Sequence, residues 1–249
     1  MSAPAGRAVL VTGGTRGIGL AIVRHLAAAG WRVAASYRGD AQAAGRLERE
    51  LAEAGAGAGV IAVLRADLAD PEAARPLVGE AVERLGGLDA LVNNAGMVDD
   101  GAFVTLERER YLRVLRTNLL GAIRVTGAAL PHLLRGTRPA VVNLASLGGV
   151  AGKEGQVAYA ASKGGLIGFT QWLARRYAAA GLAANAVAPG FVETDMIAAL
   201  TPAMTAHIVE GSAARRFGQA DEVARAVAFL LEPGYLHGTT LRLDGGFNR

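Results

Sequence analysis

Short apolar runs alternate with longer helix-like segments along almost the whole chain of 249 residues. The first run, Ala8 to Val11, is apolar at every position, which is typical of a strand buried on both faces of a parallel sheet. Parallel strands have to be joined by crossover segments, and the helix-like segments lie where such crossovers are needed. The pattern therefore predicts an α/β fold: a doubly wound parallel sheet of about seven strands with helices on both faces.

The same pattern predicts where the elements lie. We expect strands at residues 8–11, 32–36, 60–64, 88–92, 140–144, 182–187 and 240–243. We expect helices at residues 20–29, 41–54, 71–85, 157–180 and 221–231, with less regular helix at 194–211. Asp70 and Pro71 suit the N-cap and first position of the third helix. A long helix at 106–134 is expected to be interrupted near Gly121, Gly127 and Pro131.

No linker or repeat divides this pattern, so a single domain over residues 1–249 is expected. The chain has no cysteine, which excludes disulfides, thiolate metal sites and cysteine nucleophiles. Its four histidines are scattered without metal-ligand spacing, so no metal is expected. The net charge is +4, but the arginines are dispersed and aromatic residues make up only 5%, so no nucleic-acid partner is expected. No uncharged apolar stretch reaches the roughly 18 residues needed to span a bilayer, so we expect no membrane partner and a cytoplasmic location.

A glycine-rich segment follows the first predicted strand directly, from Thr12 to Gly19. Glycines in such a turn let the backbone approach a pyrophosphate, and the following helix offers free N–H groups to the anion. The segment predicts a dinucleotide-binding turn made of Gly13, Gly14, Thr15, Arg16, Gly17, Ile18 and Gly19. Because the chain has 34 glycines, a glycine-rich turn without a ligand is the alternative.

The end of the second predicted strand bears on which dinucleotide binds. An acidic residue there would accept hydrogen bonds from a free 2′-hydroxyl and favour NAD. Here the strand ends Ser36-Tyr37-Arg38, and no carboxylate follows until Asp40. Arg38 and Arg16 could together bind a 2′-phosphate, which favours NADP. A solvated Arg38, or an Asp40 that reaches back to the ribose, is the alternative.

Lysine is rare in this chain, since only Lys153 and Lys163 occur among 26 basic residues. Lys163 follows Tyr159 by four residues, a spacing that places both side chains on one face of a helix. An ammonium close to a phenol can shift the pKa of the phenol. Taken alone, the spacing fits an ordinary exposed helix pair equally well.

Together these residues resemble the classical short-chain dehydrogenase/reductase family over nearly the whole chain. The motifs that carry the resemblance are Thr12-Gly13-x-x-x-Gly17-x-Gly19, Asp67, Asn93-Asn94-Ala95-Gly96, Asn118, Ser146, Tyr159-x-x-x-Lys163 and Pro189-Gly190. Residues 159–170 and 187–196 look most like 3-oxoacyl-[acyl-carrier-protein] reductases. The resemblance implies a single-domain Rossmann fold and NADPH-dependent reduction of a 3-oxoacyl thioester to the 3-hydroxyacyl product.

The resemblance also implies catalytic roles for four residues. Tyr159 would donate the proton to the carbonyl oxygen, and Lys163 would lower the pKa of Tyr159 and hold the nicotinamide ribose. Ser146 would donate a hydrogen bond to the substrate oxygen, and Asn118 would hold a water that relays protons to Lys163. The structural alternatives are a backbone-bridging Asn118 and a Ser146 that only shapes a turn.

Further cofactor contacts are implied around the turn. Asp67 would meet the adenine edge, unless it is only a turn carboxylate, and the segment from Pro189 would cover the nicotinamide. The full implied set beyond the turn is Arg38, Asp67, Leu68, Asn94, Ala95, Gly96, Tyr159, Lys163, Pro189, Gly190, Val192 and Thr194.

The resemblance places a substrate-covering flap at about residues 194–218, whose Met196, Ile197, Leu200, Met204, Ile208 and Phe217 could grip an acyl chain. Arg215 and Arg216 could meet a phosphopantetheine or an acyl carrier protein. Ala180 stands where carrier-dependent relatives place an arginine, which weakens that expectation. A polyketide-type ketoreductase, an acetoacetyl-CoA reductase, an alcohol or sugar dehydrogenase, and a catalytically silent NADP-binding scaffold stay open. A homotetramer is implied, packed through residues 106–134, 157–180 and the last strand.

Overall fold

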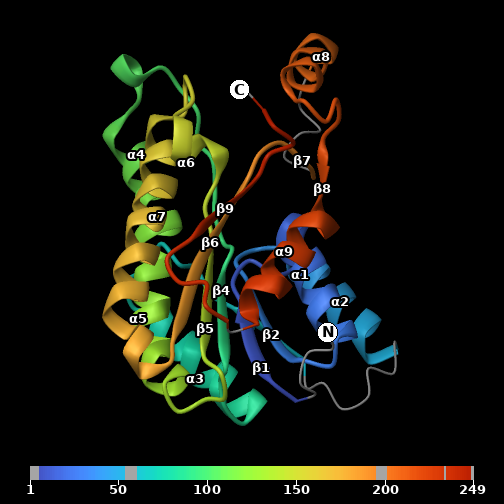
Figure 1. The fold of residues 1–249 in the computed structure, drawn as a ribbon, viewed down its shortest axis with the longest axis vertical. Coiled ribbons are helices and arrows are strands. Elements are labelled where there is room, and N and C mark those ends of the chain that lie inside the picture. The colour runs from blue at the N-terminus through green and yellow to red at the C-terminus, as the bar shows by residue number, and fades with distance from the viewer. Residues whose placement is uncertain (1–5, 54–60, 195–200, 233, 248–249) are drawn as a thin grey trace.

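The computed structural model describes residues 6–53, 61–194, 201–232 and 234–247. Seven parallel strands form one sheet in the order β3-β2-β1-β4-β5-β6-β9, which confirms the predicted doubly wound α/β fold (Figure 1). The chain direction across the sheet reverses between β1 and β4, where ligands bind in folds of this kind. The strands are β1 (Ala8–Val11), β2 (Arg32–Tyr37), β3 (Ile61–Arg65), β4 (Ala90–Asn93), β5 (Ala140–Leu144), β6 (Ala183–Pro189) and β9 (Thr240–Leu243).

Helices cover both faces of the sheet. Figure 1 shows α1 (Gly17–Ala28), α2 (Ala41–Glu53) and α9 (Ala220–Leu231) on one side, and α3 (Ala74–Leu85), α5 (Gly121–Leu133) and α7 (Val157–Tyr177) on the other. Alternate residues of a strand point to opposite faces. Val9 accordingly packs in the core beneath α1 and α9, whereas Leu10 packs in the core beneath α3 and α5, and both are fully buried. Burial on both faces is why the sequence of β1 is apolar throughout.

The third helix begins later than the sequence predicts. It starts at Ala74 with Ala73 as its N-cap, so the predicted start at Pro71 and the predicted cap at Asp70 are both wrong. The Asp70 carboxylate accepts a hydrogen bond from the Glu72 amide at 2.9 Å instead. A side chain that bonds to the amide two residues ahead closes a turn, which postpones the helix.

The long segment 106–134 is interrupted at one place only. A 3₁₀ turn (Phe103–Thr105) precedes α4 (Arg108–Leu115), and a π-helical turn at Arg116–Leu120 separates α4 from α5. The expected break near Gly121 is confirmed, but Gly127 and Pro131 lie inside α5. Gly121 is needed for packing, since a Cβ there would lie 2.8 Å from the Leu68 carbonyl oxygen. The π-helical turn buries Asn118 completely.

Three small elements at the carboxyl ends of the strands were not predicted. They are α6 (Leu147–Ala151) and two short strands, β7 (Val192–Glu193) and β8 (Gly218–Gln219), which pair with each other. The expected helix at 194–211 is present as α8 (Pro202–Gly211), and residues 195–200 lie outside the described part of the chain. A 3₁₀ turn at Ala178–Ala180 ends the long helix α7. Among the described residues, no helix is both long and apolar enough to cross a membrane.

Candidate functional site

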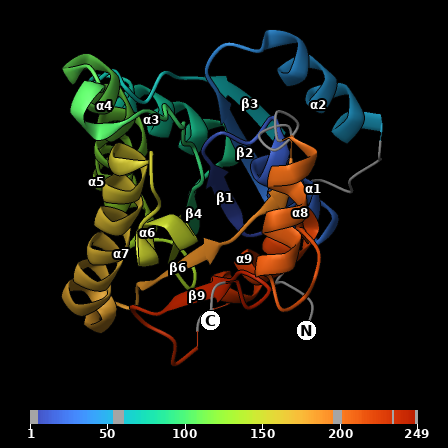
Figure 2. The ribbon, with the colours of Figure 1, turned by 90° about the horizontal axis from the view of Figure 1, so that it is seen from above.

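The predicted site residues gather at one edge of the sheet. All strands of the sheet are parallel, so the segments that follow β1, β4, β5 and β6 emerge together at their carboxyl ends. Figure 2 looks onto this edge, where α6 and α8 lie on either side of the end of β6. The glycine turn, Ser146, Tyr159 and the segment from Pro189 all belong to this edge, which makes it the candidate active site.

The turn after β1 has the geometry of a phosphate-binding loop. Gly13 has φ +65°, a left-handed conformation that favours glycine. A Cβ on Gly19 would lie 2.1 Å from the Gly13 carbonyl oxygen, so no side chain fits there. Helix α1 starts immediately at Gly17, and no side chain caps its first N–H groups. Open N–H groups at a helix start bind an anion well.

Asn94 fastens this turn to the end of β4. Its amide nitrogen donates to the carbonyl oxygens of Thr12 and Gly13, both at 2.9 Å. The Thr12 hydroxyl in turn accepts from the backbone amides of Asn94 and Ala95 at 3.0 Å. The Asn94 amide group is thus engaged within the protein, and it positions the turn rather than pointing its N–H groups outward.

The predicted adenosine end of the site is cationic. Arg16 and Arg38 are both exposed at this edge, and Arg65 at the end of β3 donates to the Arg38 carbonyl oxygen at 3.2 Å. Asp40 accepts a hydrogen bond from the Ala43 amide at 2.8 Å and so caps the start of α2. That bond argues against the alternative in which Asp40 reaches back to the ribose.

Asp67 and Leu68 follow β3. One carboxylate oxygen of Asp67 accepts from the Ala69 amide at 3.0 Å, so Asp67 shapes a turn, as its structural alternative supposed, while its other oxygen has no partner among the described hydrogen bonds. Leu68 is buried in the core beneath α3 and α5, which leaves only its backbone for a ligand.

Tyr159 and Lys163 share one face of α7, as their spacing predicts. The Lys163 ammonium lies 5.7 Å from the centre of the Tyr159 ring and donates to the Leu144 carbonyl oxygen at 2.6 Å. Lys163 is only 4% exposed, which rules out the ordinary exposed pair. Burial lowers the pKa of Lys163 from 10.5 to about 8.

Ser146 lies beside the phenol. It caps α6 by accepting from the Gly148 amide at 3.1 Å, and its hydrogen bond with Tyr159 lowers the pKa of the phenol. Burial acts more strongly in the other direction, and the nearby Asp100 carboxylate adds to it, so the pKa of Tyr159 is raised overall. The expectation that Lys163 lowers this pKa is therefore not met in the protein alone. A raised pKa keeps the phenol protonated, which is the form a proton donor needs.

Asn118 lies next to Lys163 in the interior. Its side chain accepts from the Met97 amide at 2.8 Å and donates to the Met97 carbonyl and the Ser162 hydroxyl at 2.9 and 3.1 Å. A Cβ built on Gly96 would lie 3.4 Å from the Lys163 ammonium and 3.5 Å from the Asn118 oxygen. Gly96 thus lets both polar groups come near one point. Asn118 also binds backbone groups, those of Met97, as the structural alternative for this residue predicted.

Two carboxylates near the site escaped the sequence analysis. Asp99 forms ion pairs with Arg110 and Arg113, and these hydrogen bonds lower its pKa to about 2. Asp100 accepts from the Gln156 side chain at 2.8 Å. These contacts fix the loop after β4 against α4 and against the start of α7. Only the three-dimensional structure reveals these contacts, because each carboxylate is 11 to 56 residues away from its partners in sequence.

The segment after β6 forms the opposite wall of the site. Gly190 lies against Asp244, because a Cβ there would be 2.9 Å from the Asp244 Cα. Thr194 faces the glycine turn, since a Cβ on Gly17 would lie 3.5 Å from the Thr194 methyl group. Pro189 ends β6 and Val192 is buried in β7. The structure therefore brings the predicted nicotinamide-covering residues next to the predicted phosphate turn.

The two arginines of the expected flap are engaged within the chain. Arg216 binds the Glu222 carboxylate at 2.7 and 2.8 Å, and this pairing lowers the pKa of Glu222 to about 2. Arg215 donates to the Glu210 carbonyl oxygen at 2.9 Å. Neither guanidinium is held free for a carrier protein. Met196, Ile197 and Leu200 of the flap lie outside the described residues.

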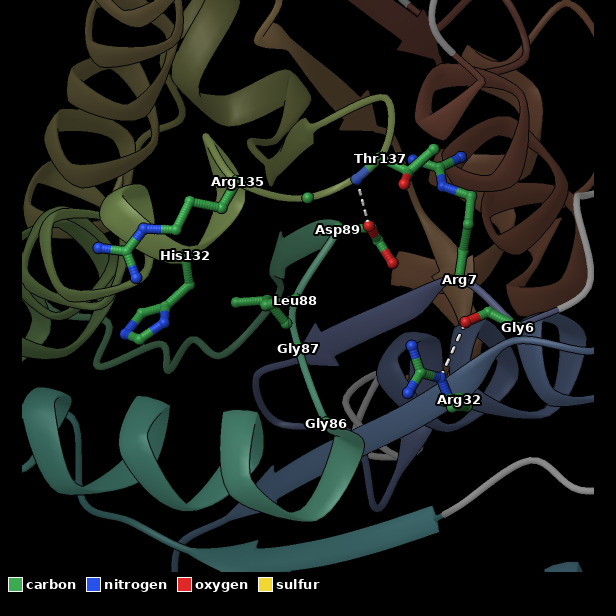
Figure 3. Close-up of a pocket in the computed structure, with 11 residues that line it drawn as sticks. Gly6, Arg7, Arg32, Gly86, Gly87, Leu88, Asp89, His132, Arg135 and Thr137 are labelled. Atoms are coloured by element: carbon green, nitrogen blue, oxygen red, sulfur yellow. Dashed lines mark hydrogen bonds between the residues drawn. The ribbon is translucent and has the colours of Figure 1, made fainter.

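A cavity of about 520 Å³ lies at the other edge of the sheet, at the amino ends of β1 and β4. In Figure 3, Arg135 and His132 point away from Asp89, which occupies the middle of the view. Both Asp89 oxygens accept from backbone amides, those of Ala8 and Thr137, at 2.7 and 2.6 Å. This carboxylate joins chain segments and is not held free for a ligand, so the cavity is not our candidate site.

Known proteins resemble this chain along nearly its full length. The family model described as enoyl-(acyl carrier protein) reductase matches residues 13–248. The chain belongs to the short-chain dehydrogenase/reductase family. A 3-oxoacyl-[acyl-carrier-protein] reductase FabG of Staphylococcus aureus is 36% identical over 96% of this chain and 97% of its own. An acetoacetyl-CoA reductase of Shinella zoogloeoides is 38% identical over 96% of this chain and 98% of its own.

Solved structures of this family agree with the fold. A short-chain dehydrogenase from Burkholderia cenocepacia in complex with NADP superimposes with a TM-score of 0.90 at 37% identity, over 97% of this chain and 98% of its own. A blue fluorescent protein from a metagenomic library in complex with NADPH gives a TM-score of 0.91 at 36% identity, over 98% of this chain and 99% of its own.

Proposed function

We propose that this protein reduces a 3-oxoacyl thioester to the 3-hydroxyacyl product, with Tyr159 as the proton donor. The observation that carries the proposal is the meeting of Ser146, Tyr159 and Lys163 at the carboxyl edge of the sheet, beside the glycine turn. Relatives named 3-oxoacyl-[acyl-carrier-protein] reductase and acetoacetyl-CoA reductase, both more than 35% identical to this chain, support this substrate class.

The chain is an NADP-dependent oxidoreductase, and its residues fit that cofactor. The open turn and the uncapped start of α1 suit a pyrophosphate, and the exposed Arg16 and Arg38 suit a 2′-phosphate. We expect the Asn94–Gly96 backbone to line the adenosine side, and Val192 and Thr194 to line the nicotinamide. The bound nicotinamide supplies the hydride, and the protein orients and polarises the ketone.

The side chains then divide the remaining work. The Tyr159 hydroxyl donates a proton to the ketone oxygen as charge develops on it, and Ser146 donates a hydrogen bond to the same oxygen. Lys163, held by Leu144 and next to Asn118, is placed to bind the ribose hydroxyls and to return a proton to Tyr159. Asn118 is the candidate to hold the water of that proton path.

Replacing Tyr159 with Phe tests the proton donor. We expect kcat with an acetoacetyl thioester to fall at least about 10³-fold, within the range of general-acid catalysis, while NADPH affinity changes less than about twofold. Steady-state NADPH oxidation measures kcat, and fluorescence titration measures the affinity for NADPH. The control is Tyr235→Phe, since Tyr235 is fully exposed. A Tyr159→Phe variant that turns over like the wild type would show that another group donates the proton.

The proposal also covers the group that carries the acyl substrate, the oligomeric state and the cellular location. A panel of one acetoacetyl group on carrier protein, on coenzyme A and on N-acetylcysteamine, beside simple ketones and sugars, identifies the substrate handle. Acyl-carrier docking through Arg215 and Arg216 is the weaker part, because both arginines have partners within the chain. The polyketide-type reductase, the homotetramer and the cytoplasmic location stay predictions.

A further inference from the structure

Lys153 is the other of the two lysines, and it has no role in the proposed function. It lies between Ser146 and Tyr159, the two residues assigned to the ketone oxygen. Its segment is a defined turn, because the Gln156 amide donates to the Lys153 carbonyl at 3.1 Å and the flanking Gly152 and Gly155 both have positive φ. The turn is fastened to the loop after β4, since the Gly101 amide donates to the Gly155 carbonyl at 2.9 Å.

The Lys153 side chain reaches across to the other wall of the site. Its ammonium lies 5.0 Å from the centre of the Phe191 ring, and Phe191 stands between the predicted nicotinamide residues Gly190 and Val192. The Phe191 ring packs edge-on against Phe247 at 5.1 Å, which holds it in place. A cation over a fixed aromatic face is oriented by that face. The ammonium is therefore held between the segment that carries the proton donor and the segment that covers the cofactor.

The three N–H donors of this ammonium are available. Within residues 6–53, 61–194, 201–232 and 234–247, no hydrogen bond or ion pair holds the Lys153 ammonium. Three carboxylates of the loop after β4 and of β7 have other partners: Asp99 binds two arginines, Asp100 binds Gln156, and Glu193 accepts from Gln219 at 2.7 Å. An exposed ammonium with free donors beside a ketone-binding site suits an anionic oxygen group.

We propose that Lys153 is a specificity-determining residue that binds an anionic oxygen group of the substrate, a carboxylate or a phosphate, on the Phe191 side of the site. The inference rests on the proposed ketone reduction and adds which ketones are preferred. When Lys153 holds the anionic group of a substrate, the ketone of that substrate is oriented toward Tyr159. The preference for charged over neutral ketones therefore appears in kcat/KM.

The experiment compares matched charged and neutral ketones with NADPH. One pair is acetoacetate and methyl acetoacetate, which differ in a carboxylate, and the other is acetoacetyl-CoA and acetoacetyl-N-acetylcysteamine, which differ in phosphates. For Lys153→Met we expect kcat/KM to fall about tenfold on the charged member of at least one pair, the scale of a charge-assisted hydrogen bond. On the neutral member we expect less than a twofold change. Lys153→Arg should keep most of the charged preference, since it keeps the charge.

Arg135→Met is the matched control, because Arg135 is an exposed cation at the opposite edge of the sheet (Figure 3). This variant should keep the wild-type preference for charged over neutral ketones, which would exclude an effect of net charge alone. The pair that responds to Lys153→Met identifies the group as carboxylate or phosphate. Equal losses on charged and neutral members, or no loss on either charged member, would overturn the inference. A wild type that reduces acetoacetate or its ester but neither thioester would instead overturn the proposed substrate class, while the first pair still decides the role of Lys153.

Discussion

Lys163 is charged in a place where water barely reaches it. It is 4% exposed, and its only described hydrogen-bond acceptor is the Leu144 carbonyl at 2.6 Å. Burial disfavours the charged form, which explains the lowered pKa of about 8. Such strain is typical of a residue retained for chemistry, because a structural role would be served better by an apolar side chain.

Lys163→Met should therefore stabilise the protein without cofactor while abolishing its activity. The pKa of Lys163 is 10.5 when unfolded and about 8 when folded, a difference worth about 3 kcal/mol in the free energy of unfolding. This penalty is fully present below pH 8, and it disappears as pH rises toward 10.5, where the unfolded chain loses the proton too. After subtracting about 1 kcal/mol for the lost hydrogen bond, we expect a gain of about 2 kcal/mol at pH 7.

Urea unfolding of both proteins at pH 7 and pH 9.5 measures this gain, and other titrating groups cancel in the comparison. The advantage of the variant should shrink at the higher pH, because the wild type regains stability there. A variant less stable than the wild type at pH 7, or an advantage independent of pH, would contradict a strained Lys163.

Arg38→Glu should move cofactor preference from NADPH toward NADH. The introduced carboxylate would repel a 2′-phosphate and accept hydrogen bonds from a free 2′-hydroxyl. We expect the ratio of kcat/KM for NADPH over NADH to fall at least about 100-fold, as loss of one charge-assisted contact and gain of one repulsion imply. Arg46→Glu on the exposed side of α2 is the control for net charge. An unchanged ratio would remove Arg38 from the phosphate site.

At the scale of elements, the contact between α6 and α7 positions the proposed catalytic pair, Tyr159 and Lys163. A Cβ on Gly149 of α6 would lie 2.6 Å from the Lys163 backbone and 2.7 Å from its Cβ. Because both clashes are with backbone or with the first side-chain atom, no flexible group can give way. Gly149 thus sets the distance between the segment that starts at Ser146 and the helix that carries Tyr159.

Gly149→Ala should destabilise the protein by about 1–3 kcal/mol, as overpacking does, and lower kcat more than it raises the KM for NADPH. Gly168→Ala is a suitable control, because Gly168 lies in α7, against which α6 packs, with open space where its Cβ would be. That substitution should stabilise α7 by up to about 1 kcal/mol. Thermal unfolding and steady-state kinetics distinguish the Gly149→Ala variant from the Gly168→Ala variant. Equal behaviour of both variants would mean that α6 can move without effect.

The sequence predicts the strands of the main sheet well, because the buried strands are mostly apolar and are separated by helix-like segments. The strands at residues 8–11, 140–144 and 240–243 are confirmed with their predicted bounds. The start of α3 was wrong because the Asp70 carboxylate closes a turn where a cap was expected. The strands β7 and β8 have only two residues each, too few to show any periodicity.

For the candidate site, motif spacing predicts which residues meet but not what each one contacts. The Tyr159–Lys163 pair lies on one helix face as expected, yet the structure raises the pKa of Tyr159 through burial, which no local pattern records. The Asn94 amide holds the glycine turn, a contact that spans 81 residues of chain. Sequence patterns are local, and these contacts depend on how distant strands are ordered in the sheet.

At the scale of the whole molecule, the candidate site and the exposed apolar surface lie on different parts of the structure. The carboxyl edge of the sheet holds the turns and the polar side chains of the candidate site, whereas the outer surface of α7 carries apolar groups that remain exposed. Trp172 on α7 is 54% exposed and packs with Phe169 and Tyr177 at ring distances of 6.3 and 6.0 Å. Trp172 is the exposed member of this cluster, and we propose that it contacts another subunit.

Trp172→Glu should therefore reduce the size of the assembly. We expect the wild type to be a homotetramer, and the variant to dissociate to dimers at micromolar concentration, because a buried charge at an aromatic contact removes a binding hot spot. Light scattering after size-exclusion chromatography measures the mass. Val104→Glu is the control, since Val104 is 90% exposed and belongs to the 3₁₀ turn rather than to α5 or α7. A variant that keeps the wild-type mass, or a wild type that elutes as a monomer, would show that this aromatic surface serves another purpose.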